Sequence, residues 1–262
     1  MNLATLRPPA NDTAADEQLA VTALRLDDGY GTSRMRLPGY VAGRIVAAAR
    51  AATTLEDASI RRITADFLVD SLPRTVNVEL VMTPMGAHGE LSRFRLAQGT
   101  RIVAHGTVVL DTSWPTPAGA SAQRPLLFPQ LSEQARRMRR DTDSRFYRID
   151  ASKELSQASR QQQRGGYIRF RDARAVNAQT VAELSDGWSM LDDSDAGLRA
   201  HCTSLTLDFS VPLRSRTWDR LRFVRIEQQS DWLIRGALIE HGMVSTYDGE
   251  QLAEFQRVVS ER

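Results

Sequence analysis

Cysteine and lysine are almost missing from this sequence. Cys202 is the only cysteine in 262 residues, so no disulfide can form within the chain. A chain without disulfides fits a reducing compartment, and we expect a cytoplasmic protein. Lys153 is the only lysine, so arginine carries almost all of the positive charge, and the net charge is only +2. So small a net charge gives no basic footprint, and we predict no nucleic-acid partner.

Long hydrophobic runs are missing as well. The longest apolar run, from Tyr40 to Ala49, is interrupted by Gly43 and Arg44, whereas a membrane span needs about 18 apolar residues. Residues 1–17 contain acids and two prolines without an apolar stretch, which is not the pattern of a signal peptide. We therefore expect no membrane span and no targeting segment.

The sequence also lacks the motifs of several enzyme classes. No two of its 4 histidines have the spacing of metal ligands; they are His88, His105, His201 and His241. There is no G-x-S-x-G nucleophile elbow, no P-loop and no dinucleotide fingerprint. We therefore predict neither a metal site nor a nucleotide cofactor.

Two segments without regular apolar periodicity divide the chain. Residues 1–18 form a predicted N-terminal arm. Residues 114–165 form a predicted connector, which opens with Trp114-Pro115-Thr116-Pro117 and could hold one helix around 132–140. Loops this long are uncommon inside one compact domain, so the connector should separate two units, 19–113 and 166–262.

In the first unit, the pattern predicts one helix and five strands. Residues 40–52 are rich in alanine and apolar on all sides, which is typical of a buried helix, and Pro38 stands where a first-turn proline is tolerated. A short strand precedes this helix at 23–26. Alternating or apolar runs predict four strands after it, at 60–69, 75–83, 90–97 and 101–110.

The second unit repeats this order. It has a strand at 167–171, a helix at 181–191, strands at 204–211, 220–227 and 232–240, and a last strand split around Asp248-Gly249. One helix wrapped by one antiparallel sheet is the hotdog layout. A single copy leaves an open sheet edge, which a tandem copy can cover. We therefore predict an α+β tandem (double) hotdog, in which an antiparallel sheet wraps one central helix in each half.

Several segments resemble the acyl-CoA thioesterase II family. The run from Pro38 to Ala49 resembles the glycine-led, alanine-rich first helix of that family. Further segments resemble its strands and hairpins: Phe67–Pro73, Gln98–Val103, Ser204–Ser210 and Tyr247–Glu254. The likeness covers most of 20–113 and 166–260, and it rests on the order of these segments.

The resemblance implies a double hotdog that hydrolyses acyl-CoA or acyl-carrier thioesters without a metal or organic cofactor. It also allows a homodimer. That family uses an Asp, a Thr or Ser, and a Gln in its second half to position and activate water. This is chemically reasonable, because a carboxylate can orient or deprotonate water while hydroxyl and amide dipoles hold the water and the thioester carbonyl.

Carried over to this chain, the resemblance gives Asp208 as the aspartate, Ser230 as the hydroxyl and Gln256 as the glutamine. A shift of two residues would put Thr206 in place of Asp208, on the same face of the strand. Asp186, on the second predicted helix, is an additional or alternative acid, because related double-hotdog proteins often place a carboxylate there.

Each of these candidates has a simpler interpretation. Thr206, Asp208 and Ser210 could form a solvated strand face, and Asp186 could be an exposed helix residue. The arginines of the connector could bind the phosphates of CoA or lie in a solvated linker. The alternative functions are a non-catalytic protein that binds acyl thioesters and a hydroxyacyl-thioester dehydratase, which would need a histidine and an acid at one tunnel.

Overall fold

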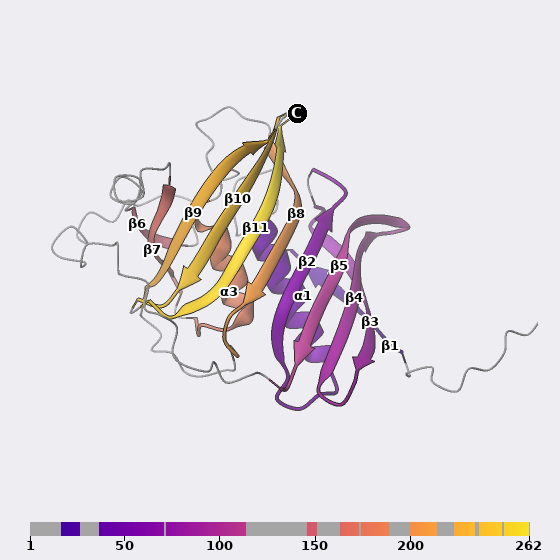
Figure 1. Ribbon diagram of the computed structural model, residues 1–262. Coiled ribbons are helices and arrows are strands. Elements are labelled where there is room, and N and C mark those ends of the chain that lie inside the picture. The colour runs from indigo at the N-terminus through magenta and orange to yellow at the C-terminus, as the bar shows by residue number, and fades with distance from the viewer. Residues whose placement is uncertain are drawn as a thin grey trace, which may run out of the picture.

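The fold comes from a computed structural model, which describes residues 17–26, 37–70, 72–113, 146–150, 163–172, 174–188, 200–213, 223–233, 236–247 and 249–261. One 11-stranded sheet dominates these residues, and α1 and α3 lie together against one of its faces (Figure 1). Neighbouring strands are antiparallel throughout.

The first part of the chain folds in the predicted order. Its elements are β1 (Gln18–Arg25), α1 (Pro38–Ala52), β2 (Ser59–Phe67), β3 (Thr75–Met85), β4 (Gly89–Gln98) and β5 (Arg101–Asp111). The helix begins with proline in its first turn and ends where Thr53 returns to an extended backbone. Nine of its 15 residues are buried, which confirms the prediction of a buried helix.

The later part repeats that order. Its elements are β6 (Phe146–Asp150), β7 (Gln163–Phe170), α3 (Ala178–Leu184), the 3-10 helix η2 (Ser185–Trp188), β8 (Ala200–Phe209), β9 (Val224–Leu233), β10 (Ala237–Ser245) and β11 (Gln251–Glu261). Strand β6 falls within the range predicted as a connector. The helix expected around 132–140 lies outside the described residues.

The strand order shows how the two parts meet. Along the sheet the strands run β1-β3-β4-β5-β2-β8-β11-β10-β9-β7-β6. Read outward from the centre, β2, β5, β4, β3 and β1 correspond one by one to β8, β11, β10, β9 and β7. The centre is the β2–β8 pair, in which Arg62 to Asp66 lie opposite Ser204 to Asp208. The sheet is therefore continuous across the middle (Figure 1).

Two glycines bring the helices into close contact. A Cβ atom on Gly39 would lie 2.3 Å from the carbonyl oxygen of Ala182, and one on Gly43 would lie 2.7 Å from that of Gln179. These positions are one turn apart on α1, so they form a flat stripe against which α3 packs. The helix contact between the two parts depends on the absence of side chains there.

Strand alternation decides which side chains face the helices. On β8, Leu205, Leu207 and Phe209 are buried, whereas Thr206 and Asp208 between them are only partly buried. Successive residues of a strand point to opposite faces. We call the face that carries Leu205 and Leu207 the inner face, and the face that carries Thr206 and Asp208 the outer face.

Several element boundaries in the second part were predicted wrongly. The helix expected at 181–191 is α3 followed by η2, and it begins at Ala178. The strands expected at 220–227 and 232–240 are β9 and β10, which begin and end several residues later. The segment 228–231, left between those two predicted strands, would be their connection. It is strand instead, because Gln228 is buried and hydrogen-bonds across β9 and β10 to Glu240.

Candidate functional site

The four predicted site residues lie on opposite faces of the sheet. Asp208 on β8 and Gln256 on β11 belong to the outer face. Ser230 lies within β9, opposite Glu240 of β10 in register, and Glu240 is a buried residue of the inner face. Asp186 lies in η2, on the same side of the sheet as the helices, and is fully buried. The four candidates therefore do not form a single cluster.

On the outer face, Asp208 forms an ion pair. Its carboxylate lies 2.5 Å from Nε of Arg62 across the β2–β8 junction, and the Asp208 side chain is 44% exposed. This hydrogen bond and the carboxylate charge raise the pKa of the Arg62 guanidinium. Gln256, which lies opposite Thr206, lines the same polar pocket of about 370 Å³ as Asp208. Glu227 and Glu254 add acidic groups to that pocket.

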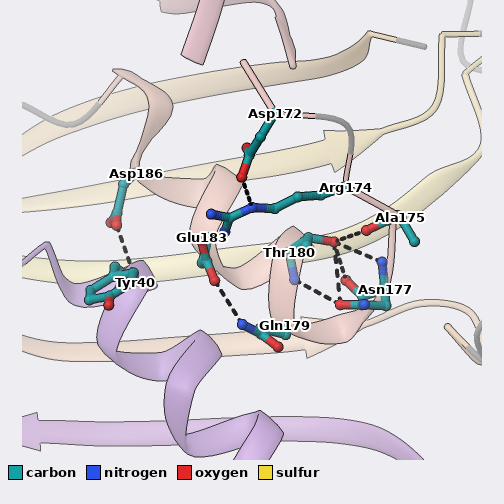
Figure 2. A network of polar contacts seen from close by, with 9 residues as sticks. All are labelled: Tyr40, Asp172, Arg174, Ala175, Asn177, Gln179, Thr180, Glu183 and Asp186. Atoms are coloured by element: carbon teal, nitrogen blue, oxygen red, sulfur yellow. Dashed lines mark hydrogen bonds and ion pairs between the residues drawn. The ribbon is translucent and has the colours of Figure 1, made fainter. Parts of the chain in front are cut away.

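On the inner side, Asp186 contacts the start of α1. The backbone N–H of Gly39 donates to Oδ1 of Asp186 at 2.8 Å, and that of Tyr40 donates to Oδ2 at 2.8 Å. Figure 2 shows the Asp186 carboxylate directed at Tyr40 from the end of α3. The first N–H groups of a helix have no partner within the helix and carry its positive end. One buried acid of the second part thus caps the buried helix of the first.

A buried polar cluster surrounds Asp186. Arg257 of β11 places Nη1 3.4 Å from Oδ1 of Asp186, pairs through Nε with Glu240, and donates from Nη2 to Oε1 of Gln228 at 2.9 Å. Gln228 in turn donates to Oε1 of Glu240 at 2.7 Å. Asp186, Glu240 and Arg257 are fully buried. We call these four residues the Asp186 cluster: Asp186, Gln228, Glu240 and Arg257.

Of this cluster, only Asp186 was predicted from the sequence. A signal for Arg257 was present, since it stands between Phe255 and Val259 at the strand period of two, in phase with buried residues. Gln256, the residue that was chosen, is out of phase with them. The signal for Gln228 is weaker, because only Ile226 is an apolar residue in the same phase, whereas Ser230 on the other side is polar.

Cys202 lies within the electrostatic reach of the same cluster. Burial raises the pKa of the Cys202 thiol to about 12, and the charges of Asp186 and Glu240 add to the rise, while Arg257 opposes it. The thiolate is the nucleophilic form, and at this pKa little of it forms near neutral pH, so the pKa of Cys202 does not favour a nucleophilic role. The described residues also contain no group of three or more histidine, cysteine, aspartate or glutamate side chains that could hold a metal ion.

Helix α3 is fixed by polar contacts at its start. Asn177 and Thr180 form a capping box, in which each side chain hydrogen-bonds the backbone N–H of the other. One turn further on, the buried carboxylate of Glu183 accepts hydrogen bonds from Arg174 at 3.1 Å and from Gln179 at 3.0 Å (Figure 2). These contacts hold α3 in the position from which Asp186 reaches α1.

Comparison with known proteins supports the fold. No family model and no curated protein matches the chain. Among solved structures, a conserved protein of unknown function with a hot dog fold from Alicyclobacillus acidocaldarius superposes with a TM-score of 0.75 at 13% identity, covering 94% of this chain and 96% of that one. The acyl-CoA thioesterase II TesB2 from Mycobacterium marinum gives 0.64 at 16% identity, covering 87% and 90%.

A 12:0-ACP thioesterase from Umbellularia californica is also similar, with a TM-score of 0.56 at 14% identity over 93% of this chain and 94% of that one. Structures of acyl-CoA thioesterase II proteins are thus among the neighbours of this chain, as the resemblance in the sequence implied. Identities this low establish the fold alone, which is a hotdog fold. In the described residues, no helix is long and apolar enough to cross a membrane.

Proposed function

We propose that this chain is a tandem double hotdog that hydrolyses acyl thioesters carried by CoA or by an acyl carrier. Two units, 19–113 and 166–262, would each supply one hotdog. The matching order of elements on the two sides of the β2–β8 junction supports this division. The observation that carries the proposed activity is the buried carboxylate of Asp186, which faces two backbone N–H groups at the start of α1.

The chemistry follows from what those groups can do. In the proposed reaction, the thioester carbonyl oxygen accepts hydrogen bonds from the N–H groups of Gly39 and Tyr40, which then stabilise the oxyanion. Asp186, displaced from these donors, orients a water molecule and accepts its proton as the oxygen attacks the carbonyl carbon. The carbon–sulfur bond then breaks, and the leaving thiolate takes up the proton that Asp186 accepted, which restores the carboxylate. Arg257 stays beside the displaced carboxylate as its counter-charge.

One observation favours a second candidate, a protein that binds acyl thioesters without hydrolysing them. Both carboxylate oxygens of Asp186 already accept backbone hydrogen bonds, so a substrate must displace at least one of them. A structural cap of this kind would leave the scaffold able to bind and unable to hydrolyse. A dehydratase has less support: the pairs His201–Asp70 and His105–Asp66, at 3.6 Å and 3.9 Å, are partly exposed.

Release of free thiol from acyl-CoAs of increasing chain length tests the proposal. Wild type should turn over at least one of them, and Asp186→Asn, which keeps the size of the side chain, should lose that turnover. Asp208→Ala is the matched comparison, because Asp208, Ser230 and Gln256 remain predicted site residues. Turnover lost only in Asp208→Ala would assign the acid to the outer face. No turnover on any acyl-CoA, with binding intact, would favour the binding protein.

A further inference from the structure

A second polar pocket lies between α1 and α3. It has a volume of about 390 Å³, and its lining residues are almost all polar; they include Tyr40, Arg44, Arg174, Asn177, Gln179 and Glu183. An apolar acyl chain would leave these polar groups without hydrogen-bond partners, which is unfavourable. The composition of the pocket therefore points to a polar ligand or to a polar part of one.

Arg44 is the cation of this pocket that lacks a counter-charge. It is partly buried, and its Nε atom is buried without a hydrogen-bond partner. In the part of the chain that the structure describes, Arg44 forms no ion pair and no hydrogen bond through its side chain. A guanidinium is always charged and offers donors in a planar fork that fits a carboxylate or phosphate.

The acids near Arg44 are already engaged elsewhere. Glu183 accepts hydrogen bonds from Arg174 at 3.1 Å and from Gln179 at 3.0 Å, and Arg174 also binds Asp172 at 2.7 Å (Figure 2). Both acids are therefore paired with Arg174, and neither forms an ion pair with Arg44. Arg44 remains in the wall of the pocket as a cation without a direct ion pair, and its buried Nε can donate to an anionic ligand.

The pocket adjoins the Asp186 cluster through Tyr40. Tyr40 lines the pocket, and its backbone N–H donates a hydrogen bond to Asp186. Arg44 follows Tyr40 by one helical turn, which is a rise of about 6 Å at 1.5 Å per residue. Tyr40 and Arg44 therefore lie on the same side of α1 in successive turns, which favours a short acyl group between the thioester carbonyl and a terminal oxyanion. The phosphates of CoA lie the whole length of the pantetheine arm away from the thioester.

We propose that Arg44 binds the terminal carboxylate of a short dicarboxylic acyl group, so that the substrate is a monothioester of a dicarboxylic acid. This inference rests on the proposed function and names its substrate class. The oxyanion bound at Arg44 could come from the acyl group or from a phosphate of CoA, and the experiment separates the two sources.

The test uses thioethers, which cannot be hydrolysed. Carboxypropyl-CoA and butyl-CoA have the same four-carbon skeleton and differ in the terminal group, which is a carboxylate in one and a methyl group in the other. The matching pantetheine thioethers lack every phosphate. Calorimetry should show carboxypropyl-CoA binding at least about 10-fold more tightly than butyl-CoA, as a charge-assisted hydrogen bond would give. The same preference should hold for the pantetheine pair. Equal binding within both pairs would overturn the inference.

Two variants assign the preference to its residue. Arg44→Gln should abolish the advantage of the carboxylate and leave the affinity for butyl-CoA nearly unchanged. Arg50→Gln is the matched control, since Arg50 is an exposed arginine in the last turn of the same helix, and it should keep the advantage. If Arg44→Gln weakens both CoA thioethers equally and neither pantetheine thioether binds, Arg44 contacts a phosphate, and the carboxylate assignment is wrong.

Failure of this inference is distinct from failure of the proposed function. Binding of the thioethers does not require catalysis, so the preference for a carboxylate can be measured in a protein that hydrolyses nothing. Conversely, turnover of butyryl-CoA without any preference for succinyl-CoA would support hydrolysis and exclude the dicarboxylic substrate. With both correct, Arg44→Gln should raise the KM for succinyl-CoA about 10-fold or more and leave that for butyryl-CoA unchanged.

Discussion

The carboxylate of Asp186 accepts a hydrogen bond from the backbone N–H of Gly39, 147 residues away in the chain. The contact is possible because Gly39 has no side chain: a Cβ atom there would lie 2.8 Å from Oδ1 of Asp186 and 2.5 Å from the hydroxyl oxygen of Ser185. One glycine in the first part and one acid in the second thus fix how the two central helices meet.

Replacing Asp186 by alanine should strongly destabilise the protein. The change leaves the N–H groups of Gly39 and Tyr40 buried without acceptors, and it removes one of the two acids near Arg257. We expect a loss of about 3–5 kcal/mol in the free energy of unfolding, measured by urea denaturation. Asp208→Ala, which removes a partly exposed ion pair, should cost about 1 kcal/mol or less. Equal effects of the two changes would contradict the structural role of Asp186.

A side chain on Gly43 should separate the two helices. Its Cβ atom would lie 2.7 Å from the carbonyl oxygen of Gln179 and 2.9 Å from Cγ of Glu183. Alanine favours a helix over glycine by about 1 kcal/mol, but we expect overpacking to outweigh this gain and to lower the stability of Gly43→Ala by about 1–3 kcal/mol.

Thermal unfolding measures this effect, and Ala51→Gly, at an exposed position of the same helix, supplies the control. That reverse change should cost about 1 kcal/mol through helix propensity alone. Stabilisation by Gly43→Ala would mean that α1 and α3 do not pack closely at this turn.

The features of the fold that depend on local pattern could be predicted from the sequence. The alanine-rich run after Pro38 became α1, and the alternation in Thr75–Met85 became β3, because burial of one side leaves a regular apolar signal. The predicted bounds of β9 were wrong, because a buried polar side chain interrupts the apolar pattern there. Among the described residues, Gln228 hydrogen-bonds Glu240 and Arg257, which lie 12 and 29 residues away in the chain, so its burial could not be inferred locally.

The candidate site depends even more on contacts between distant segments. Asp186 was predicted from the resemblance. Its partners are backbone N–H groups at the start of α1, and no side chain in the sequence marks them. Arg44 looked like an interruption of an apolar run. Its place in the wall of a polar pocket depends on the packing of α3 beside α1, which the sequence pattern does not predict.

Arg257 should be necessary for the stability of the fold, mainly because two buried carboxylates lie beside it. Arg257→Met would leave Asp186 and Glu240 buried with one fewer cation, and we expect a loss of about 3–5 kcal/mol in the free energy of unfolding. Adding Glu240→Gln removes one of the uncompensated charges, so the double variant should be more stable than the sum of the single changes predicts. A double-mutant cycle measures this coupling, and strict additivity would contradict an interaction between Arg257 and Glu240.

The single cysteine should report on the integrity of the cluster. Burial raises the pKa of the Cys202 thiol from 9.0 to about 12. In the folded protein at pH 8, iodoacetamide should therefore alkylate Cys202 at least about 100-fold more slowly than in urea, because little thiolate forms and the sulfur is buried. Mass spectrometry gives a clear result, since there is no second cysteine. Fast labelling of the native protein would contradict the burial of this strand.

The same shift predicts how stability depends on pH. The folded state binds the thiol proton more tightly than the unfolded state does, so Cys202 gives its full contribution below about pH 9. As pH rises from about 9 towards 12, the unfolded thiol ionises while the folded one does not, and the free energy of unfolding falls. Other groups also titrate in this range, so wild type should be compared with Cys202→Ala by urea denaturation at each pH. The difference between the two proteins should shrink above pH 9, and a constant difference would mean that the thiol ionises equally in both states.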